Sequence, residues 1–376
     1  LHLLSRRQRQ MCIRDRVDEA YYKAVMGIEI NPGLDKSDFK IVYSPQHGAD
    51  NIPVRTCLKR LGYDIVPVLA QCAPDPDYTN TKSPNPEVDA SYELAIKLAK
   101  EVDADVVAIT DPDGDRLGVV AKHNGEYVLM SGNQSAAVYL EYILSQRKEK
   151  GTLPDNAVMY NTIVTSDLGE LVARNYGVDV EKTLTGFKFI GDKIRKYEKT
   201  HEKQFIFGYE ESYGCVVEDF VRDKDAVQAV LLAAECGNYY KKQGKDLIDV
   251  LNELYAKYGT FKESQIALAK AGAAGAARIK EMMDTLRQDK PTEIGGVKVV
   301  LSEDYATSER SDGTTIDLPK SNVLKYYLED GSWIAARPSG TEPKCKFYFS
   351  IKGKDAKDAA DKTEVFHKAM MELIGE

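Results

Sequence analysis

Apolar residues divide the chain into short strand-like runs separated by stretches with a helical period. β-Branched and aromatic residues gather in runs at 39–44, 63–69 and 104–110. Between these runs, apolar residues recur every three to four positions over 49–61 and 88–101. Strands that alternate with helices are typical of βαβ units, so this region is predicted to form a mostly parallel sheet.

A second round of the same alternation follows residue 150, with β-rich runs such as "AVMYNTI" separated by further helical periods. The strands and helices predicted here are, in chain order, 157–163, 166–176, 177–183, 189–199, 204–212 and 225–243. The pattern therefore predicts a second α/β domain of similar plan.

The C-terminal third has a different pattern. The alanine-rich stretch 269–288 is predicted to be a helix, and Asp330-Gly331 is predicted to be a tight turn. Alternating segments predicted as antiparallel strands lie at 296–302, 322–338 and 345–353, and the turn falls within the second of them. A closing helix is predicted from Asp355 onward. Antiparallel strands combined with helices predict an α+β domain.

These patterns predict an α/β fold class, with two consecutive α/β domains followed by a C-terminal α+β domain. The predicted boundaries are 1–16 (a segment outside the pattern), 17–35 (a helix and linker left from a preceding domain), 36–150, 151–260 and 261–376. The helix in 17–35 is expected to end near Asn31-Pro32-Gly33, because proline and glycine interrupt helices.

Residues 1–16 carry five arginines and one acid and have no helical or strand period. A transit peptide would be arginine-rich and acid-poor, but it would also be serine-rich and amphipathic. The "MCIRDR" stretch resembles translated sequencing-adapter read-through. We interpret the segment as non-native, with a transit peptide and a native extension as the alternatives.

Composition narrows the possible partners. With 43% apolar and 29% charged residues, the 376-residue chain has an ordinary globular composition. No apolar run approaches the roughly 18 to 20 residues of a membrane span, and a net charge of −8 disfavours nucleic acid and anionic membranes as partners. The six cysteines form no C-x-x-C pair, so we interpret them as reduced thiols, mostly in the core. We expect a cytoplasmic protein, a monomer by default, that binds a small molecule.

The stretch "ITDPDGDRLG" (109–118) places Asp111, Asp113 and Asp115 directly after a predicted strand. Pro112 and Gly114 allow the chain to curl, so that three carboxylates spaced too far apart in an extended strand can converge. Clustered carboxylates repel one another, and a divalent cation relieves this repulsion. Because the ligands are all oxygen, the pattern predicts Mg²⁺, or alternatively Mn²⁺, with Arg116 as a partial counter-charge. The alternative is a solvated acidic turn.

Two other sites that contain such acids do not match this loop. An EF-hand needs glycine and glutamate where Arg116 and Lys122 stand. A phosphatase of the haloacid dehalogenase type would use Asp111 as its nucleophile and Asp113 as its acid. That type expects threonine or valine where Asp115 stands.

Two further loops carry candidate binding groups. In "ARPSGTEPK" (336–344), Arg337 offers a bidentate fork, and Ser339, Gly340 and Thr341 offer hydroxyl and backbone N–H groups to an anion. In "FGYEESYG" (207–214), acidic and hydroxyl side chains suit hydrogen bonds from sugar hydroxyls. A plain turn between strands and a surface acidic turn are the respective alternatives.

Taken together and in this order, the three loops resemble those of the α-D-phosphohexomutases, the phosphoglucomutase and phosphomannomutase superfamily. "DPDGDR" is similar to the family's metal loop, "GYEES" to its sugar loop and "RPSGTEP" to its phosphate loop. Other matching stretches are "SPQHGA" (44–49), "TKSPNPE" (81–87), "TLTGFKFIG" (183–191) and "VRDKDA" (221–226). The resemblance runs from about residue 17 to the end and is greatest to bacterial α-phosphoglucomutases.

The resemblance implies a four-domain enzyme in which Mg²⁺ links these aspartates to a phosphoserine on the first domain. That serine exchanges its phosphoryl group with a phosphorylated hexose through glucose 1,6-bisphosphate. The implied metal ligands are Asp111, Asp113 and Asp115, with Arg116 beside the transferring phosphoryl group.

The same resemblance implies roles for the remaining candidate residues. Glu210 and Ser212 would hold the sugar hydroxyls, and Lys188 matches a lysine proposed for proton transfer or charge stabilisation, the alternative being a surface lysine. The residues implied to hold the phosphate that is not being transferred are Arg337, Ser339, Gly340 and Thr341.

The chain departs from the family pattern at the nucleophile. The family places its serine in a Thr-Ala-Ser-His-Asn-Pro type of stretch, which this sequence does not match. Ser83, in "KSPNPE", has no adjacent histidine and matches a second-domain segment, so it is not expected to be the nucleophile. His47 is interpreted as structural, at a domain junction. We therefore expect domains 2 to 4, and no turnover by this chain alone.

The predicted function is that of a phosphoglucomutase, interconverting glucose 1-phosphate and glucose 6-phosphate, when the phosphoserine domain is present. Mutases of the same family that act on mannose or pentose phosphates remain alternatives. A noncatalytic phosphosugar-binding protein is a further alternative, although such a protein has no need for all three aspartates.

Overall fold

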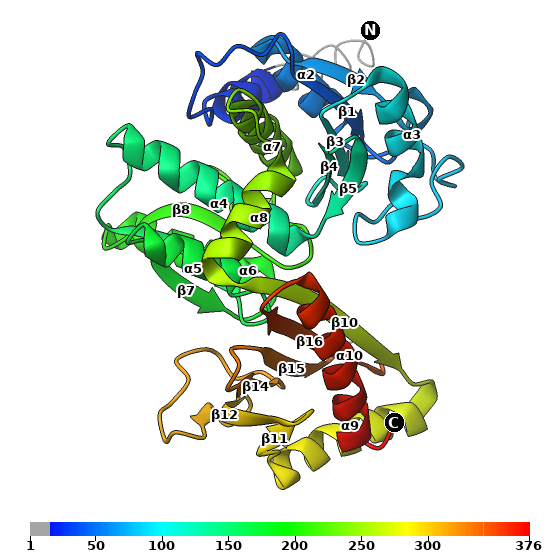
Figure 1. The fold of residues 1–376 in the computed structure, drawn as a ribbon, viewed down its shortest axis with the longest axis vertical. Coiled ribbons are helices and arrows are strands. Elements are labelled where there is room, and N and C mark those ends of the chain that lie inside the picture. Colours follow the sequence, from blue (N-terminus) through cyan, green and yellow to red (C-terminus); the bar gives the residue numbers. More distant parts are fainter. Residues whose placement is uncertain (1–15, 341) are drawn as a thin grey trace, which may run out of the picture. The chain divides into compact units, whose positions relative to one another are not determined.

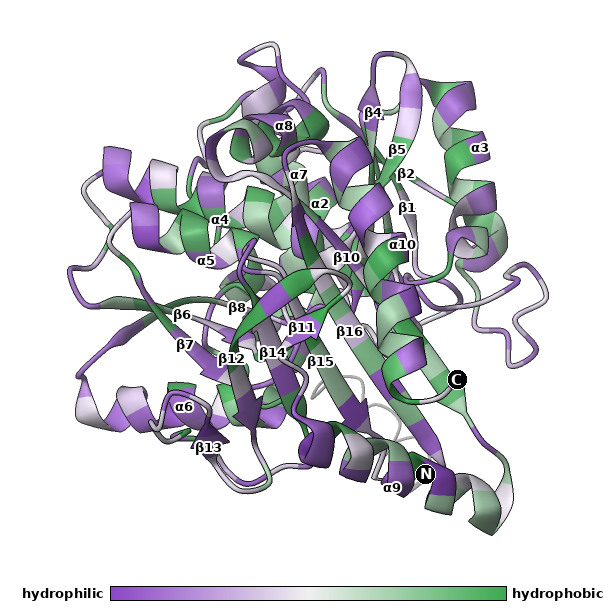
Figure 2. Ribbon diagram, turned by 60° about the horizontal axis from the view of Figure 1, so that its bottom comes forward, coloured by the Kyte–Doolittle hydropathy of each residue, from purple (hydrophilic) through white to green (hydrophobic). Residues whose placement is uncertain are grey.

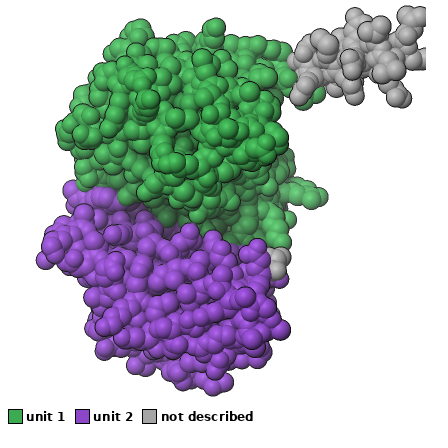
Figure 3. All heavy atoms as spheres, turned by 90° about the vertical axis from the view of Figure 1, so that its right-hand side faces the viewer, with its two compact units in different colours: residues 1–162, 169–253 green, residues 163–168, 254–376 purple. Residues whose placement is uncertain are grey.

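The computed structural model describes residues 16–340 and 342–376. They form two compact units, which Figure 3 shows in different colours. The first unit comprises the described residues up to 162 together with 169–253, and the second comprises 163–168 and 254–376. In the part of the chain that the structure describes, no helix is both long and apolar enough to cross a membrane.

The first sheet is the predicted βαβ region with a hairpin added at one edge. Its strand order is β2-β1-β3-β4-β5, parallel through β2, β1 and β3 and antiparallel through β4 and β5. The strands are β1 Lys40–Ser44, β2 Asp64–Pro67, β3 Val106–Thr110, β4 Leu117–His123 and β5 Glu126–Met130. The associated helices are α2 Asn51–Leu61 and α3 Glu93–Val102, with short 3₁₀ turns η1 Leu69–Gln71 and η2 Asp89–Tyr92.

The hairpin of β4 and β5 was not among the predicted elements. Its turn is Asn124-Gly125, with φ of 50° and 84°, which matches the type I′ turns that favour such pairs of residues. The strand predicted at 63–69 is also shorter than expected, because η1 begins at Leu69.

The helix predicted near the start covers 16–26 and ends before Gly27, earlier than the expected stop at Asn31-Pro32-Gly33. Val25 is completely buried. Glu19 pairs with Arg60 of α2 at 2.6 Å, and the Tyr21 hydroxyl donates to Asp225 at 2.8 Å. This helix is therefore packed into the first unit.

The second sheet has the order β7-β6-β8-β9, with β7, β6 and β8 parallel and β9 antiparallel to β8. Its strands are β6 Ala157–Thr162, β7 Asp179–Thr183, β8 Gln204–Tyr209 and β9 Cys215–Val216. The helices of this region are α4 Gly132–Glu149, α5 Leu168–Asn175, α6 Phe187–Thr200, α7 Ala226–Lys241 and α8 Leu247–Tyr258.

Helix α7 explains why both parallel sheets belong to one unit. It follows the second sheet in sequence, yet it packs against α2, β3 and β4 of the first (Figure 1). Nearly all its residues are buried, and Asp225 caps its first turn by accepting from the N–H groups of Val227 and Gln228. Most of the segments predicted as 36–150 and 151–260 thus lie in one compact unit.

The second unit is built on an antiparallel sheet with the order β10-β16-β15-β14-β12-β11, and β13 pairs with β12. Its strands are β10 Thr260–Ala269, β11 Glu293–Ile294, β12 Val297–Asp304, β13 Glu309–Arg310, β14 Leu324–Leu328, β15 Trp333–Pro338 and β16 Lys344–Gly353. Its helices are α9 Gly272–Asp289 and α10 Ala356–Leu373. The α+β character of this part is confirmed, although β10 was not predicted.

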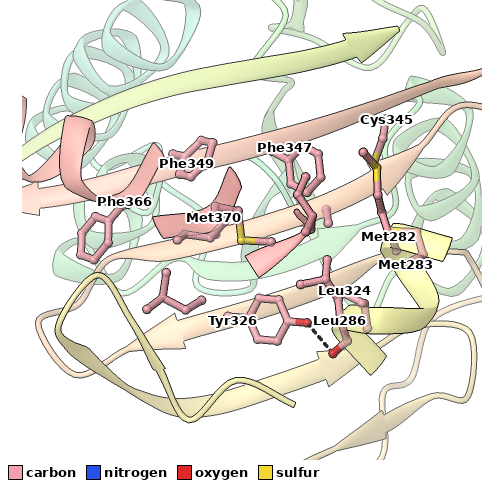
Figure 4. Packing of buried hydrophobic residues seen from close by; sticks show 14 of the residues in the cluster. Met282, Met283, Leu286, Leu324, Tyr326, Cys345, Phe347, Phe349, Phe366 and Met370 are labelled. Carbon is pink, nitrogen blue, oxygen red and sulfur yellow. Dashed lines mark hydrogen bonds between the residues drawn. The ribbon is translucent and has the colours of Figure 1, made fainter. Parts of the chain in front are cut away.

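The core of the second unit lies between this sheet and its two helices (Figure 4). Phe347 and Phe349 come from β16, and Phe366 and Met370 from α10. The Tyr326 hydroxyl donates to a main-chain carbonyl of α9 at 3.3 Å. Hydrophobic and hydrophilic residues alternate around α10 in Figure 2, as its single buried face requires. Each fully buried phenylalanine contributes about 1.5–3 kcal/mol to this core.

The five described cysteines are all buried and free, in agreement with their interpretation as core thiols. Cys12, like the rest of the segment 1–15, lies outside the described residues.

Candidate functional site

The aspartate loop begins at the end of β3, whose five residues are all buried. Gly114 has a φ of 75°, and its N–H donates to the Asp111 carbonyl at 3.1 Å, which closes the predicted curl. The carboxylate oxygens of Asp111, Asp113 and Asp115 come within 4.8 Å of one another. The loop therefore brings together the three side chains that the sequence singled out.

The three acids differ in exposure and partners. Asp111 is buried, and its Oδ1 accepts from the main-chain N–H groups of Asp115 and Arg116, each at 3.0 Å. Asp115 is half-buried and Asp113 is exposed. Asp111 thus stabilises the loop, while Asp113 is open to solvent. The all-oxygen donor set at this spacing fits Mg²⁺ or Mn²⁺.

Arg116 lies beside this cluster. Its Nε is 3.7 Å from Asp111 Oδ2 and 3.7 Å from Asp115 Oδ1, and its Nη1 is 2.8 Å from Glu87 Oε1. Glu87 belongs to the stretch "TKSPNPE", so this segment orients the arginine. The predicted counter-charge is in place.

Lys224 is a second cation at the loop, one to which sequence reasoning assigned no role. Its Nζ is 3.2 Å from Asp115 Oδ2, and its side chain is only 15% exposed. It lies in "VRDKDA", immediately before Asp225 at the start of α7. That stretch was noted only as a similarity, and nothing in it indicated proximity to the aspartates.

Negative charge still predominates at the loop. Burial, followed by the nearby carboxylates of Asp115 and Asp113, raises the pKa of Asp111 to about 6, against the hydrogen bonds that lower it. Asp50, to which the sequence analysis assigned no role, is a further acid near this loop. Burial, followed by Asp225 and the loop acids, raises the pKa of Asp50 to about 7. A divalent cation would favour the ionised carboxylates here.

The loop rests on the segment 44–49. A Cβ on Gly48 would lie 2.4 Å from Pro112 Cα, and the Ala49 N–H donates to the Pro112 carbonyl at 2.9 Å. His47 is buried, with Nδ1 2.7 Å from the Ala73 carbonyl. This contact supports the interpretation of His47 as structural. The carbonyl of Ser83 accepts from the Ser91 hydroxyl at 2.6 Å.

The candidate sugar loop follows β8. Glu210 is 8% exposed, and its Oε1 accepts from the Gly186 N–H at 2.8 Å. Burial raises the pKa of this carboxyl above its usual range, while the Gly186 hydrogen bond and Lys224 oppose the rise. Ser212 is half-buried in the turn that follows. Glu210 thus ties the sugar loop to Gly186, which precedes α6.

Lys188 is the second residue of α6 and is exposed. It lines a cleft of about 740 Å³, together with Asp50, Gly114 and Lys224. Sequence-distant cations and acids of the first unit therefore surround one opening beside the aspartate loop.

The candidate phosphate loop lies in the second unit, where β15 passes into β16. Arg337 is half-buried near the end of β15 and, among the described residues, forms no ion pair. The Ser339 N–H donates to the Lys344 carbonyl at 2.7 Å, and Ser339 Oγ accepts from the Glu342 N–H at 3.3 Å. Gly340 is exposed with open space around it. Thr341 lies outside the described residues.

Known proteins are similar to this chain in sequence. A phosphoglucomutase of Staphylococcus haemolyticus is 38% identical over 325 residues, covering 85% of this chain and 58% of the relative. A phosphoglucomutase of Staphylococcus epidermidis is 38% identical over 346 residues, covering 90% of this chain and 62% of the relative. The chain thus spans about three fifths of the length of these relatives.

Solved structures show the same fold at lower identity. The Paramecium exocytosis-sensitive phosphoprotein parafusin, described as a phosphoglucomutase in its open form, superposes with a TM-score of 0.70 at 18% identity, covering 95% of this chain and 63% of its own. A putative phosphomannomutase from Thermus thermophilus gives 0.65 at 18% identity, covering 96% and 66%.

Family models match three successive parts of the chain. Residues 19–125 match the phosphoglucomutase/phosphomannomutase alpha/beta/alpha domain II, and residues 131–258 match alpha/beta/alpha domain III. Residues 271–366 match the family's C-terminal domain. The resemblance seen in the sequence is therefore confirmed, and the chain belongs to the phosphoglucomutase/phosphomannomutase family.

Proposed function

We propose that this chain carries the metal, sugar and phosphate sites of a phosphoglucomutase that interconverts glucose 1-phosphate and glucose 6-phosphate. The observation that carries the proposal is the convergence of three aspartate carboxylates within 4.8 Å, flanked by Arg116 and Lys224. Family membership and 38% identity to phosphoglucomutases support glucose phosphates as substrates.

In this proposal Asp111, Asp113 and Asp115 hold Mg²⁺, which supplies positive charge to a phosphoryl group during transfer. Arg116 and Lys224 add positive charge at the edge of the same loop, and Lys188 does so from α6. Such positioned charges stabilise the negative charge that spreads over the phosphoryl oxygens during transfer.

The remaining residues orient the sugar. Glu210, fixed by the Gly186 N–H, and Ser212 accept hydrogen bonds from sugar hydroxyls. Arg337, Ser339, Gly340 and Thr341 bind the phosphate that is not transferred, with Arg337 supplying a bidentate fork.

We propose further that the 376-residue chain does not complete this cycle alone, because its sequence has no match to the phosphoserine stretch of the family. Purified chain, free of host mutase, is expected to convert no glucose 1-phosphate in an assay coupled to a glucose 6-phosphate dehydrogenase. Steady turnover proportional to chain concentration would contradict this part of the proposal.

Binding of glucose 1,6-bisphosphate tests the site without requiring turnover. Without a cation, the clustered acids repel a phosphate, so we expect calorimetry to show at least about tenfold tighter binding with Mg²⁺ than with EDTA. Glucose, which lacks phosphate, serves as the control and should not bind measurably. Equal affinity in both conditions would favour a metal-independent phosphosugar-binding protein.

A further inference from the structure

Asp50 is a buried acid whose side chain has no evident structural task. It immediately precedes α2 and is 6% exposed, yet it makes no side-chain hydrogen bond to cap that helix. Among the described residues its Oδ2 has no hydrogen-bond partner. Buried polar groups are nearly always partnered, and an unpartnered buried carboxylate is costly.

The carboxylate of Asp50 lies directly against the metal loop. A Cβ placed on Gly114 would come within 2.4 Å of Asp50 Oδ1 and 2.7 Å of its Oδ2. Only glycine leaves room for this contact, and Gly114 lies between Asp113 and Asp115 in the chain. Asp50 and Gly114 also line the same 740 Å³ cleft.

The neighbours of Asp50 do not neutralise it. The nearby carboxylates of Asp225, Asp111, Asp115 and Asp113 all act on it repulsively. Asp225 is fully engaged, accepting from Tyr21, Val227 and Gln228. The amine of Lys224 is 3.2 Å from Asp115 and 3.2 Å from Asp223. A cation held at this loop would stabilise the ionised form of this buried carboxyl group beside the nearby acids.

We infer that Asp50 is a positioning residue of the cation site: it supports Gly114 from behind and adds a fourth carboxylate charge that increases the affinity for a divalent ion. This inference rests on the proposed metal function of the loop. Asp50 is not assigned as a direct ligand, because it does not belong to the group of three acids whose oxygens lie within 4.8 Å of one another.

The test uses the full chain and Mn²⁺, whose free form is measured by electron paramagnetic resonance. Asp50→Asn keeps the size of the side chain and removes its charge. Its Mn²⁺ affinity is expected to fall about 10- to 100-fold, the range seen when supporting groups around metal ligands are removed. Asp64→Asn, which removes one exposed charge in the same sheet, is the matched control and should bind as the wild type does.

Melting temperature separates this role from a purely structural one. Metal-free Asp50→Asn should melt no lower than the wild type, since the substitution relieves repulsion, while its stabilisation by Mn²⁺ should shrink. A structural carboxylate would change the melting temperature equally with and without Mn²⁺, and that result would overturn the inference. Should Asp50→Asn not fold, Asp50→Ser permits the same comparison.

The result for the wild type distinguishes the two proposals. If the wild-type chain binds no Mn²⁺, the proposed metal function fails, and this inference fails with it. If the wild type binds Mn²⁺ and Asp50→Asn binds it equally well, only the role of Asp50 is wrong.

Discussion

Replacing Asp113 with asparagine is expected to weaken Mn²⁺ binding by this chain at least about 100-fold. Asp113 is the exposed member of the three acids, and it makes none of the hydrogen bonds by which Asp111 holds the loop. The substitution therefore removes one charge and leaves the loop's own hydrogen bonds in place. Asparagine keeps the shape of the side chain and one of its oxygens.

The expected size follows from electrostatics. A divalent cation and a carboxylate at roughly 2.1 Å attract each other by roughly 4 kcal/mol even at the dielectric constant of water. The carboxylate must shed water to bind, which offsets part of this energy, so a loss of at least about 100-fold is a conservative expectation.

Electron paramagnetic resonance titration with Mn²⁺ measures the change, with Asp64→Asn again as the charge-matched control. Circular dichroism should match the wild type and the metal-free melting temperature should be no lower, because no described contact is lost and one repulsive charge is removed. An affinity within about threefold of the wild type would contradict the assignment of Asp113 as a ligand.

Replacing Gly48 with alanine is expected to destabilise the first unit by about 1–3 kcal/mol and to weaken Mn²⁺ binding as well. The added methyl group would lie 2.4 Å from Cα, 2.6 Å from the carbonyl oxygen and 2.8 Å from the carbonyl carbon of Pro112. All three are backbone atoms, so no flexible side chain can move aside. Pro112 stands between Asp111 and Asp113, and any shift of it changes the spacing of their carboxylates.

Thermal unfolding and Mn²⁺ titration of the same protein check both effects, with a shift of about 2–4 °C expected for each kcal/mol. Gly33→Ala is the matched control, because a methyl group there meets nothing within 4 Å and the backbone needs no positive φ. Unchanged melting and unchanged metal affinity in Gly48→Ala would show that the segment 44–49 does not support the loop.

Local sequence patterns were sufficient for most strands and for several helices with one buried face, although α8, which also has one, was not among the predicted elements. Strand β1 and helix α10 match their predicted positions closely, because alternation and helical periodicity are properties of neighbouring residues. Helix α4 was missed although a capping box formed by Ser131 and Gln134 begins it. Most of its residues are buried, so it shows no polar face and no clear period.

In the candidate site, too, some residues could be predicted from local sequence and others could not. Asp111, Asp113 and Asp115 were predicted to converge because Pro112 and Gly114, in the same few residues, determine how the loop curls. Asp50 and Lys224 were not predicted, because the residues next to them in the sequence do not indicate which side chains they approach in the folded chain. They come from segments about 60 and 110 residues away from the aspartate loop.

The sequence by itself determined the alternation of strands and helices, the three motif loops and the family to which they belong. These features depend on residue types within a few positions of one another. Only the tertiary structure decided that α7 packs on the first sheet and that Lys224 and Asp50 flank the aspartates. The physical reason is that burying the apolar surface of α7 brings distant segments together, and side-chain proximity across such distances follows from packing rather than from local pattern.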